Sequence, residues 1–449
     1  MRLSVIGLGK LGSPLAAVFA SKGHRVIGVD VNAECVRLLT VGKAPVQEPH
    51  LQDVIDRAHR RLTATLSCED AVLGSDLTFV TVPTPSDGTG VFSGESVVAA
   101  VEQVGSALRK KTGYHVVGIA STVMPGTTGG AIREALEKSS GRLVGDGVGL
   151  CYTPTFVALG SAVHDILAPD FVLLGESDSR AGDVVERLYR DSCDNAPPIR
   201  RMGLMNAEIA KLAVNTYVTT KISYANMLAE ICEGLPGADV DVVTSAIGLD
   251  SRIGPKSLTG ATGYGGPCFP RDNRALGALA RRTGARADIA EATDRLNRYQ
   301  VERLAAHVRA QAPPGATIGI LGLSYKPDTP VVEASPGVAL AMQLKSAGYL
   351  VKVFDPMALD AARASLGPTS VAASMDACAR EADVLVITTP WPVFRSLDPA
   401  SLRRAGRRPV VIDCWRLLPR ERFEGVADVA HLGSGDDWST GQRRHGMAS

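Results

Sequence analysis

The sequence VIGLGKLG at residues 5–12 joins a short apolar run to the start of a helical pattern. Its glycines have the spacing GxGxxG, directly after a predicted strand and before a predicted helix, which is typical of a dinucleotide-binding turn. Gly7 permits the tight turn, Gly9 lets a pyrophosphate approach the backbone, and Gly12 permits close packing of the helix against the strand. The stretch therefore predicts a Rossmann-type unit whose helix N-terminus faces phosphates.

Asp30 supports this prediction because it ends the next predicted strand, where an acidic side chain binds a ribose 2′-hydroxyl. No Arg adjoins Asp30 to accept a 2′-phosphate, so the pattern favours NAD over NADP. The alternative, a glycine-rich turn in another α/β fold, is disfavoured by Asp30. The residues of these elements expected to contact NAD are Gly7, Gly9, Leu11, Gly12 and Asp30.

The first half of the chain alternates apolar runs with helical patterns. Segments such as 14–21 and 96–108 predict amphipathic helices. This alternation is typical of a doubly wound sheet. The buried parallel strands are expected at residues 3–6, 25–29, 77–82 and 115–120.

The middle of the chain is predicted to be helical. Residues 207–232 contain no Gly or Pro and carry apolar residues at helical spacing, which predicts one long helix ended by Gly234 and Pro236. Residues 288–310 predict a second long helix, stopped by the Pro-Pro-Gly run at 313–315. Long helices must bury their apolar faces, and a two-fold homodimer is the commonest way to do so.

The opening pattern then returns, because residues 316–323 form another apolar run that enters a glycine turn. Further strands are expected at 351–354, 384–388 and 410–412. The chain is therefore expected to be an α/β protein with two Rossmann-like doubly wound domains joined by a mainly helical central segment. The expected domains are residues 1–198, 199–312 and 313–449.

One feature marks a domain boundary, and another describes the end of the chain. The pair Pro197 and Pro198 predicts the first boundary. The tail after about Leu432 is rich in Gly, Ser and charged residues, and is expected to be mobile.

Composition narrows the class of protein. The 449 residues are 45% hydrophobic and 21% charged, which is typical of a globular protein with a large core. The net charge of +1 gives no reason to expect nucleic acid or a membrane surface as a partner, and no apolar run reaches the length of a membrane span. The eight cysteines are scattered, with no CxxC pair or Cys/His cluster, so we expect no disulfide framework, no metal site and a cytoplasmic location. The N-terminus enters a strand pattern directly, so no signal peptide is expected.

Cys268 lies in the run GYGGPCFPRD at residues 263–272. A nucleophilic cysteine needs open backbone around it and charged groups nearby, and this run offers both. The alternative is a buried core thiol, because free cysteine is among the most buried residue types. The dinucleotide motif in the same chain favours the nucleophile.

Further motifs, together with this run, resemble the UDP-glucose/GDP-mannose dehydrogenase family over nearly the whole chain. They are VPTP at 82–85, STVMPGT at 121–127, AEIAK at 207–211 with Asn215, RIG at 252–254 and LSYKPDT at 323–329. The resemblance implies an NAD-dependent oxidation of C6 of a nucleotide sugar such as UDP-glucose, from alcohol to acid, with two NAD per sugar. It also implies that the third domain binds the nucleotide sugar and that the central domain carries the dimer interface and the nucleophile loop.

The resemblance assigns chemical roles to five residues. Cys268 would attack the C6 aldehyde as a thiohemiacetal, while Lys211 and Asn215 would stabilise the oxyanion. Asp272 would move protons or orient Lys211 and a water, and Thr122 would position a water. The plainer alternatives are a solvated helix lysine at Lys211, a helix cap at Asp272 and a turn residue at Thr122.

The resemblance also implies binding roles. Arg252 would reach the sugar or phosphate from a neighbouring subunit, or else is a surface cation, and Lys326 would bind the diphosphate. The cofactor site would gain Pro83, Thr84, Ser121 and Thr122. The residues expected around the nucleotide sugar are Thr155, Phe156, Lys211, Asn215, Arg252, Tyr264, Gly265 and Lys326.

The run YTPTFVALG at 152–160 departs from the family pattern, in which two glutamates are usual. Thr155 and Leu159 stand at their positions. The resemblance implies that the first glutamate acts as acid and base when water cleaves the thioester, and losing a positioned general base costs about 10²–10⁴ in rate. Thr155 still permits a bound water, and His164 or Asp165 are the candidates to replace the carboxylate.

Three functions follow from these residues. The first is complete four-electron oxidation with the missing glutamate compensated, which we favour. The second is an altered enzyme that stops at the aldehyde, holds the thioester or oxidises the sugar only transiently. The third is a non-catalytic binding protein, which gives no reason for Cys268 and Lys211 to occur together. A 6-phosphogluconate-type or hydroxyacid dehydrogenase shares the layout but does not need the cysteine loop.

Overall fold

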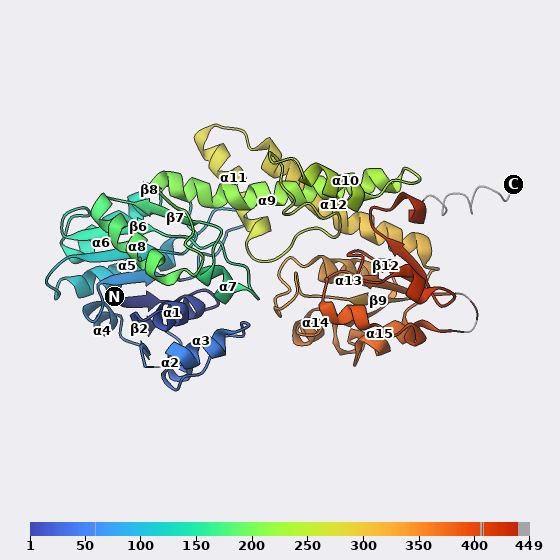
Figure 1. Ribbon diagram of the computed structural model, residues 1–449, viewed down its shortest axis with the longest axis horizontal. Helices are drawn as coiled ribbons and strands as arrows, with labels where there is room; N and C mark the ends of the chain where they lie inside the picture. The colour runs from blue at the N-terminus through green and yellow to red at the C-terminus, as the bar shows by residue number, and fades with distance from the viewer. Residues whose placement is uncertain (59, 405, 407, 439–449) are drawn as a thin grey trace. The chain divides into compact units, whose positions relative to one another are not determined.

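The computed structural model describes residues 1–58, 60–404, 406 and 408–438. The chain forms two compact units, and Figure 1 shows a sheet with covering helices in each. The first unit comprises Met1–Val214 with Ala278–Ala285, and the second Asn215–Gly277 with Arg286–Ser449. The predicted fold class, two Rossmann-like parallel sheets with a helical segment, is confirmed. The three domain limits stay predictions.

The first sheet has the strand order β3-β2-β1-β4-β5-β6-β7-β8, and only the β6–β7 pair is antiparallel. The order reverses between β1 and β4, and ligands bind at such a switch point, beyond the carboxyl ends of the strands. The last strand extends the sheet to Gly203, past the proline pair. The strands are β1 (Arg2–Ile6), β2 (Arg25–Val29), β3 (Leu62–Thr65), β4 (Leu77–Val80), β5 (His115–Ile119), β6 (Val148–Tyr152), β7 (Val172–Glu176) and β8 (Ile199–Gly203).

Helices cover both faces of this sheet. Successive strand residues face opposite ways, so Phe79 joins one apolar cluster and Val80 the other. Phe79 stacks on Phe19 of the first helix, with 5.5 Å between ring centroids. One face is covered by α1 (Gly12–Ser21), α3 (Leu51–Ala58), α7 (Ala162–Leu167) and α8 (Ser179–Ser192), and the other by α4 (Cys68–Leu73), α5 (Glu95–Leu108) and α6 (Arg133–Ser140). The remaining helices of this part are α2 (Ala33–Thr40) and the short η1 (Thr128–Ile132).

The second sheet is entirely parallel, with the order β10-β9-β11-β12-β13. Its strands are β9 (Thr317–Leu321), β10 (Leu350–Phe354), β11 (Val384–Ile387), β12 (Val410–Asp413) and β13 (Asp428–His431). Its helices include α13 (Pro336–Ser346), α14 (Leu359–Leu366) and α15 (Met375–Glu381).

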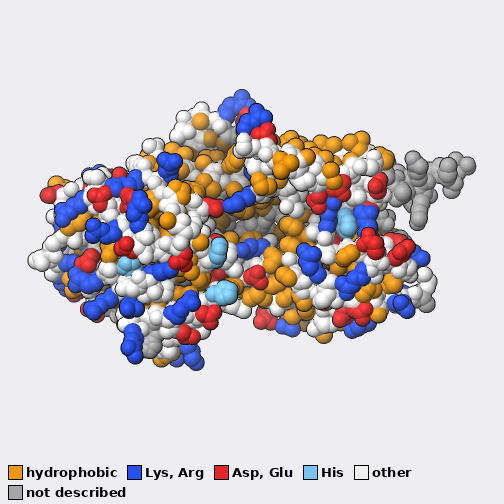
Figure 2. Space-filling view, viewed as in Figure 1, with side chains coloured by type: hydrophobic (Ala, Val, Ile, Leu, Met, Phe, Trp, Pro, Cys, Tyr) orange, Lys and Arg blue, Asp and Glu red, His pale blue; other side chains and the backbone are white. Residues whose placement is uncertain are grey.

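The long predicted helices are confirmed. The first is α9 (Leu204–Glu233), which runs from the first unit into the second, and the other is α12 (Asp288–Gln311). Between them lie α10 (Val240–Gly248) and α11 (Phe269–Thr283). On the face drawn in Figure 2, basic and acidic side chains are interspersed, as expected from a net charge of +1.

The segment after Leu432 packs on the second unit as far as Trp438. The prediction that the tail is mobile is therefore wrong for residues 433–438. Leu432 is buried, the amide of Gly433 donates to Glu233 Oε1 at 2.8 Å, and the Trp438 ring lies 4.0 Å from that of His307. These apolar and polar contacts tie the segment to α9 and α12. The rest of the predicted tail, 439–449, lies outside the described residues.

Membrane spans and metal-binding clusters are both absent from the described part of the chain. None of its helices has both the length and the hydropathy of a membrane span. No group of three or more His, Cys, Asp or Glu side chains there has an arrangement that could hold a metal ion. The cytoplasmic location stays a prediction.

His115 forms part of a buried polar network in the first sheet. Its Nε2 lies 2.8 Å from Thr78 Oγ1, and its Nδ1 lies 3.1 Å from Lys111 Nζ. Burial and the nearby Lys111 charge lower the pKa of His115 from 6.5 to about 3. The imidazole is therefore neutral in the folded protein near pH 7, although the unfolded chain takes up a proton below about pH 6.5.

We expect this proton to set a pH limit on stability. Because the folded pKa lies below the unfolded one, the free energy of unfolding falls by up to about 1.4 kcal/mol per pH unit below about pH 6.5. His115→Gln should have a lower free energy of unfolding at neutral pH. Its free energy of unfolding should depend less on pH, by the slope that uptake of about one proton produces. Urea unfolding between about pH 7.5 and 5 measures this slope. His50→Gln is the control, since that side chain is 76% exposed. Equal pH slopes for His115→Gln and the parent would contradict the assignment.

Candidate active site

The glycine turn after β1 has the geometry that the sequence predicts. Gly7 has φ +94°, and a β carbon there would lie 2.9 Å from the carbonyl oxygen of Thr81. A β carbon on Gly12 would overlap the carbonyl oxygen of Gly7, whereas one on Gly9 would meet nothing within 4 Å. The backbone at Gly9 is therefore open, and α1 begins three residues later, which fits a pyrophosphate at the helix N-terminus.

Asp30 completes this half of the cofactor site. Its Oδ2 accepts a hydrogen bond from the amide of Leu8 at 2.6 Å, and its Oδ1 accepts from the amide of Asn32 at 2.8 Å. Each carboxylate oxygen has a second lone pair, so the half-buried group can also accept from ribose hydroxyls. Leu11 lies at the N-cap of α1. The turn, the helix end and the acid together fit NAD.

The other predicted cofactor residues lie on the loops after β4 and β5, neighbouring strands whose carboxyl ends meet. Thr84 Oγ1 donates to the carbonyl oxygen of Thr122 at 2.7 Å. Ser121 Oγ donates to the carbonyl oxygen of Val82 at 2.7 Å. The two loops, including exposed Pro83, are thus joined.

Glu208 fixes the loop that follows Thr122, a role that sequence reasoning missed. Its side chain is fully buried, and its two oxygens accept from the amides of Gly126 at 2.6 Å and Thr128 at 2.7 Å. Burial raises the pKa of Glu208, although these hydrogen bonds oppose the rise. The carboxylate thus ties the start of η1 to the first turns of α9.

Lys211 lies one turn further along α9 and is 7% exposed. Its Nζ donates to the carbonyl oxygen of Thr155 at 2.7 Å and lies 4.3 Å from the centroid of the Phe156 ring. A buried ammonium over an aromatic face is held electrostatically. The alternative of a solvated lysine is therefore wrong, and three predicted site residues come together in the first unit.

Two acidic side chains, Glu48 and Asp165, hold the loop that carries Thr155. Glu48 accepts from the amides of Gly160 and Ala162, both at 2.8 Å. Asp165 Oδ2 accepts from the amide of Ala158 at 3.0 Å and from Ser161 Oγ at 2.9 Å. Asp165 thus serves the turn.

His164, the other candidate to replace the missing glutamate, has a side chain that is 75% exposed. Its Nδ1 lies 3.3 Å from Asp165 Oδ1. The hydrogen bonds of these two residues give neither of them a contact with Thr155.

Cys268 is exposed and immediately precedes α11 in the second unit. Its carbonyl oxygen accepts the amide of Asp272 at 2.8 Å, which begins the helical bonding. A helix N-terminus stabilises negative charge, as a thiolate requires. The alternative of a buried core thiol is wrong.

Asp272 is fully buried and bonds to Asn215 of α9, whose Nδ2 donates to Asp272 Oδ2 at 2.6 Å. Arg271 Nε donates to the other oxygen at 3.3 Å. Asp272 lies inside the first turn of α11, so the alternative of a cap residue before this helix is wrong. Asn215 and Asp272, predicted separately, thus form one pair.

Tyr264, predicted to contact the substrate, has a buried side chain that is held by the protein itself. Its amide donates to Asn297 Oδ1 at 2.7 Å, and Asn297 Nδ2 donates to its carbonyl oxygen at 2.9 Å. Its hydroxyl accepts from Asn273 Nδ2 at 3.0 Å. Tyr264 therefore anchors the cysteine loop to α11 and α12.

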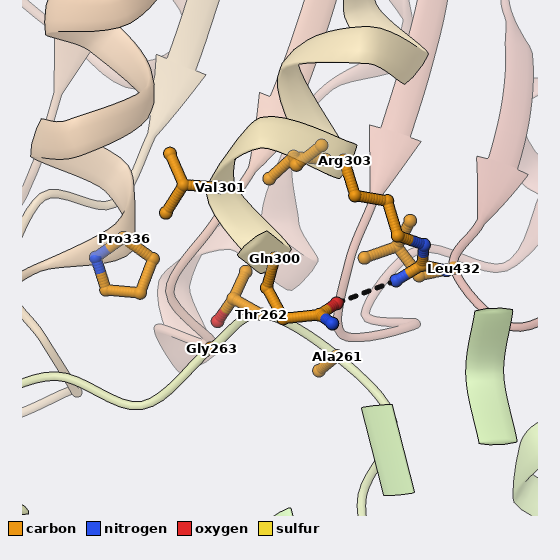
Figure 3. A pocket seen from close by; sticks show the side chains of 9 residues that line it. Ala261, Thr262, Gly263, Gln300, Val301, Arg303, Pro336 and Leu432 are labelled. Carbon is orange, nitrogen blue, oxygen red and sulfur yellow. Dashed lines mark hydrogen bonds between the residues drawn. The ribbon is translucent and has the colours of Figure 1, made fainter. Parts of the chain in front are cut away.

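A small cavity lies under the start of this loop, beside Gly263 and the α12 residues Gln300 and Arg303 (Figure 3). Its volume is about 10 Å³, which is room for a single water molecule at most. The amide oxygen of Gln300 accepts from Arg303 at 2.9 Å. The cavity is a packing gap, too small for any part of a nucleotide sugar.

Two of the binding residues expected in the second unit, Arg252 and Lys326, lie apart from Cys268 in the chain. Arg252 has a side chain that is 86% exposed and pairs with Asp250 at 2.7 Å. Lys326 is half-buried in the loop after β9. The predicted site residues are divided between the two units, with Lys211 and Asn215 one helical turn apart on α9.

Comparison with known proteins agrees with this fold. Three models of the UDP-glucose/GDP-mannose dehydrogenase family match the chain: the NAD binding domain at 1–193, the central domain at 205–299 and the UDP binding domain at 319–420. The UDP-glucose 6-dehydrogenase AglM of Haloferax volcanii is 36% identical, over 94% of this chain and 98% of its own. The UDP-glucose 6-dehydrogenase TuaD of Bacillus subtilis is 33% identical, over 96% and 92%.

Solved structures give the same result. A UDP-glucose dehydrogenase from Pyrobaculum islandicum superposes with a TM-score of 0.86 and 34% identity, covering 97% of both chains. A UDP-D-ManNAc dehydrogenase from Pyrococcus horikoshii has a TM-score of 0.82 and 26% identity, over 97% of this chain and 100% of its own. Fold, motifs and comparisons define an NAD-dependent nucleotide-sugar dehydrogenase. The chain belongs to the UDP-glucose/GDP-mannose dehydrogenase family.

The glycine turn generates a test of the cofactor site. Gly9→Ala should leave the unfolding temperature unchanged, because its β carbon meets nothing within 4 Å, yet weaken NAD binding at least about tenfold by occupying the pyrophosphate's place. Gly12→Ala should lower both stability and affinity, because its β carbon overlaps the backbone. Calorimetric titration with NAD measures the affinities. Gly88→Ala, in an open loop, is the control. Unchanged NAD affinity in Gly9→Ala would place the cofactor elsewhere.

Proposed function

We propose that this enzyme oxidises C6 of a UDP-glucose-like nucleotide sugar to the uronate in two steps, with Cys268 as the nucleophile. The observation that carries the proposal is an exposed thiol at the N-terminus of α11, one helical turn before the buried Asp272–Asn215 pair. The UDP binding domain model and the names of the relatives support a UDP-sugar. NAD, when bound, accepts one hydride in each oxidation.

The first part of the reaction uses the charges around the thiol. After C6 is oxidised to the aldehyde, Cys268 Sγ adds to C6 and the carbonyl oxygen becomes an oxyanion. Lys211 Nζ and the Asn215 amide are the donors proposed to stabilise it. Loss of a second hydride from C6 leaves a thioester on Cys268. Asp272 accepts a hydrogen bond from the Asn215 amide and so positions it, and Asp272 also takes up protons.

Hydrolysis of the thioester is the step that Thr155 puts in question. Water adds to C6, the C–S bond breaks, the sulfur leaves as a thiolate, and the acid is released. A general base speeds such a step about 10²–10⁴-fold, and a threonine hydroxyl cannot act as one near neutral pH. We propose that a water held by Thr122 and Thr155 attacks C6 of the thioester slowly, yet fast enough for complete oxidation.

The second candidate function is an enzyme that stops before hydrolysis. It is favoured by the hydrogen bonding of Glu48 and Asp165, whose carboxylates serve loop amides rather than a water at Thr155. In that case the aldehyde would be released, the thioester would persist, or the sugar would be oxidised only transiently.

Mass spectrometry of the protein separates these candidates. With NAD and UDP-glucose we expect two NADH per uronate released, and no turnover in Cys268→Ser. Thr155→Glu should raise the steady-state rate by about 10-fold or more, because hydrolysis limits the parent enzyme. Cys193→Ser, which changes another thiol, is the control.

Other outcomes have defined meanings. One NADH with a free aldehyde, or a lasting adduct on Cys268, would establish the second candidate. Turnover that survives Cys268→Ser would contradict the role of the thiol. GDP-mannose and other nucleotide sugars, assayed in parallel, test the proposed base and sugar.

We also propose a homodimer, formed by the apolar face of α9 and α10 in the second unit. Tyr217, Tyr224 and Ile231 recur every seven residues along α9 and are 63%, 49% and 51% exposed. On α10 Val242 is 68% exposed, and Leu249 just after it is 87% exposed. Figure 2 shows hydrophobic side chains gathered over these helices. A monomer rarely leaves such a stripe uncovered.

The dimer makes the role of Arg252 testable by complementation. Arg252→Ala and Cys268→Ala should each be inactive alone. If Arg252 serves the partner's site, mixed dimers contain one intact site, and co-refolded protein should recover about a quarter of the parent activity. No recovery would show that Arg252 acts within its own chain. Leu249→Glu should yield monomers in sedimentation analysis, because a buried charge opposes the interface.

A further inference from the structure

The loop that carries Cys268 touches the loop that carries Lys326, and both belong to the second unit. We call residues 263–268 the nucleophile loop and residues 324–334 the nucleotide loop. The amide of Gly266 donates to the carbonyl oxygen of Glu333 at 2.9 Å. A β carbon on Gly265 would lie 2.5 Å from the carbonyl oxygen of Ala334. The two backbones therefore meet directly, with no side chain between them.

Tyr325 makes the second contact between the loops. Gly266 has φ +85°, and a β carbon there would lie 2.6 Å from Cε2 of the Tyr325 ring. A β carbon on Gly265 would lie 3.1 Å from the Tyr325 β carbon. The tyrosine thus packs on the bare backbone of both glycines, two residues before Cys268. Close-packed groups transmit displacement, so a shift of the ring moves this backbone.

The nucleotide loop is fixed at its start and strained further on. The amide and hydroxyl of Ser324 both donate to Asp355 at 2.9 Å, and its carbonyl oxygen accepts from Thr389 Oγ1 at 2.7 Å. Asp328 and Ala334 have φ +62° and +49°, in the left-handed region. For residues other than glycine this region is energetically unfavourable. Such strain is commonest at ligand clamps and switch regions.

We propose that Tyr325 is a positioning residue that couples nucleotide binding at the nucleotide loop to the reactivity of Cys268. Lys326 follows Tyr325 directly, so a diphosphate held by Lys326 selects one arrangement of the loop. The position of the tyrosine ring in that arrangement then sets the position of the glycine backbone. The inference rests on the proposed function in taking the nucleotide loop as the diphosphate site. Its consequence is that the thiol is set for addition only when a nucleotide is bound, which protects it from other electrophiles.

The alkylation rate of Cys268 tests this coupling without any turnover. The full chain is treated with iodoacetamide, with and without saturating UDP, and the Cys268 peptide is followed by mass spectrometry. UDP should raise the rate at least about threefold in the parent protein and in Tyr325→Phe, which keeps the ring. The rate should change less than about 1.5-fold in Tyr325→Ala and Tyr325→Leu. Calorimetry should show that both variants still bind UDP.

A second readout distinguishes coupling from a purely structural role. Tyr325→Ala should lower kcat while the affinity for UDP stays within about twofold of the parent value. Tyr299→Ala is the control, because this half-exposed ring on α12 bonds to Glu230 and should leave the UDP effect intact.

The outcomes that overturn the inference differ from those that overturn the proposed function. If UDP-saturated Tyr325→Ala shows the parent's rise in alkylation, UDP acts on Cys268 without Tyr325 and the coupling is refuted. An unchanged or lower rate in the parent protein refutes it as well. GDP is titrated in parallel and replaces UDP if it alone binds. Failure of both to bind contradicts the proposed nucleotide site, and the inference with it.

Discussion

The close approach of a helix to the turn before it is the constraint on which both halves of the molecule depend. In the first unit Gly12 lies so close to the carbonyl oxygen of Gly7 that no β carbon fits, and Thr81 Oγ1 donates to that same oxygen at 2.7 Å. The second unit repeats this with Gly337 against Gly322. The contact directs the helix N-terminus at the carboxyl edge of each sheet, where the loops with the site residues begin.

The two units use the acid after their second strand differently. Asp30 is half-buried, and each of its oxygens accepts one amide, which leaves capacity for a ligand. Asp355 is fully buried and accepts from Leu323, Ser324, Met357 and other donors. Its lone pairs are used by the protein, so the same position keeps capacity for a ligand in one unit and anchors a loop in the other.

Sequence reasoning recovered what depends on local pattern and missed what depends on distant contacts. Glycine spacing and helical periodicity predicted the turns and the long helices, because these follow from neighbours along the chain. Glu208 and Glu48 act on amides about 80 and more than 110 residues away, and no spacing signals such bonds. The hydrogen bonds that hold Tyr264 to Asn297 of α12 likewise join residues 33 apart in the chain. The unusual residue Thr155 was visible at once, whereas the acids that hold its loop were not.

That loop has a consequence for how the enzyme's chemistry can change. Lys211 bonds to the carbonyl oxygen of Thr155, a group that every amino acid supplies, and Glu48 and Asp165 hold the following turn. The side chain at 155 therefore contributes little to the architecture around it. If this side chain governs thioester hydrolysis, as we propose, a lineage or an engineer can exchange it and move the end point of the reaction between aldehyde, bound acyl group and acid, while the scaffold stays as it is.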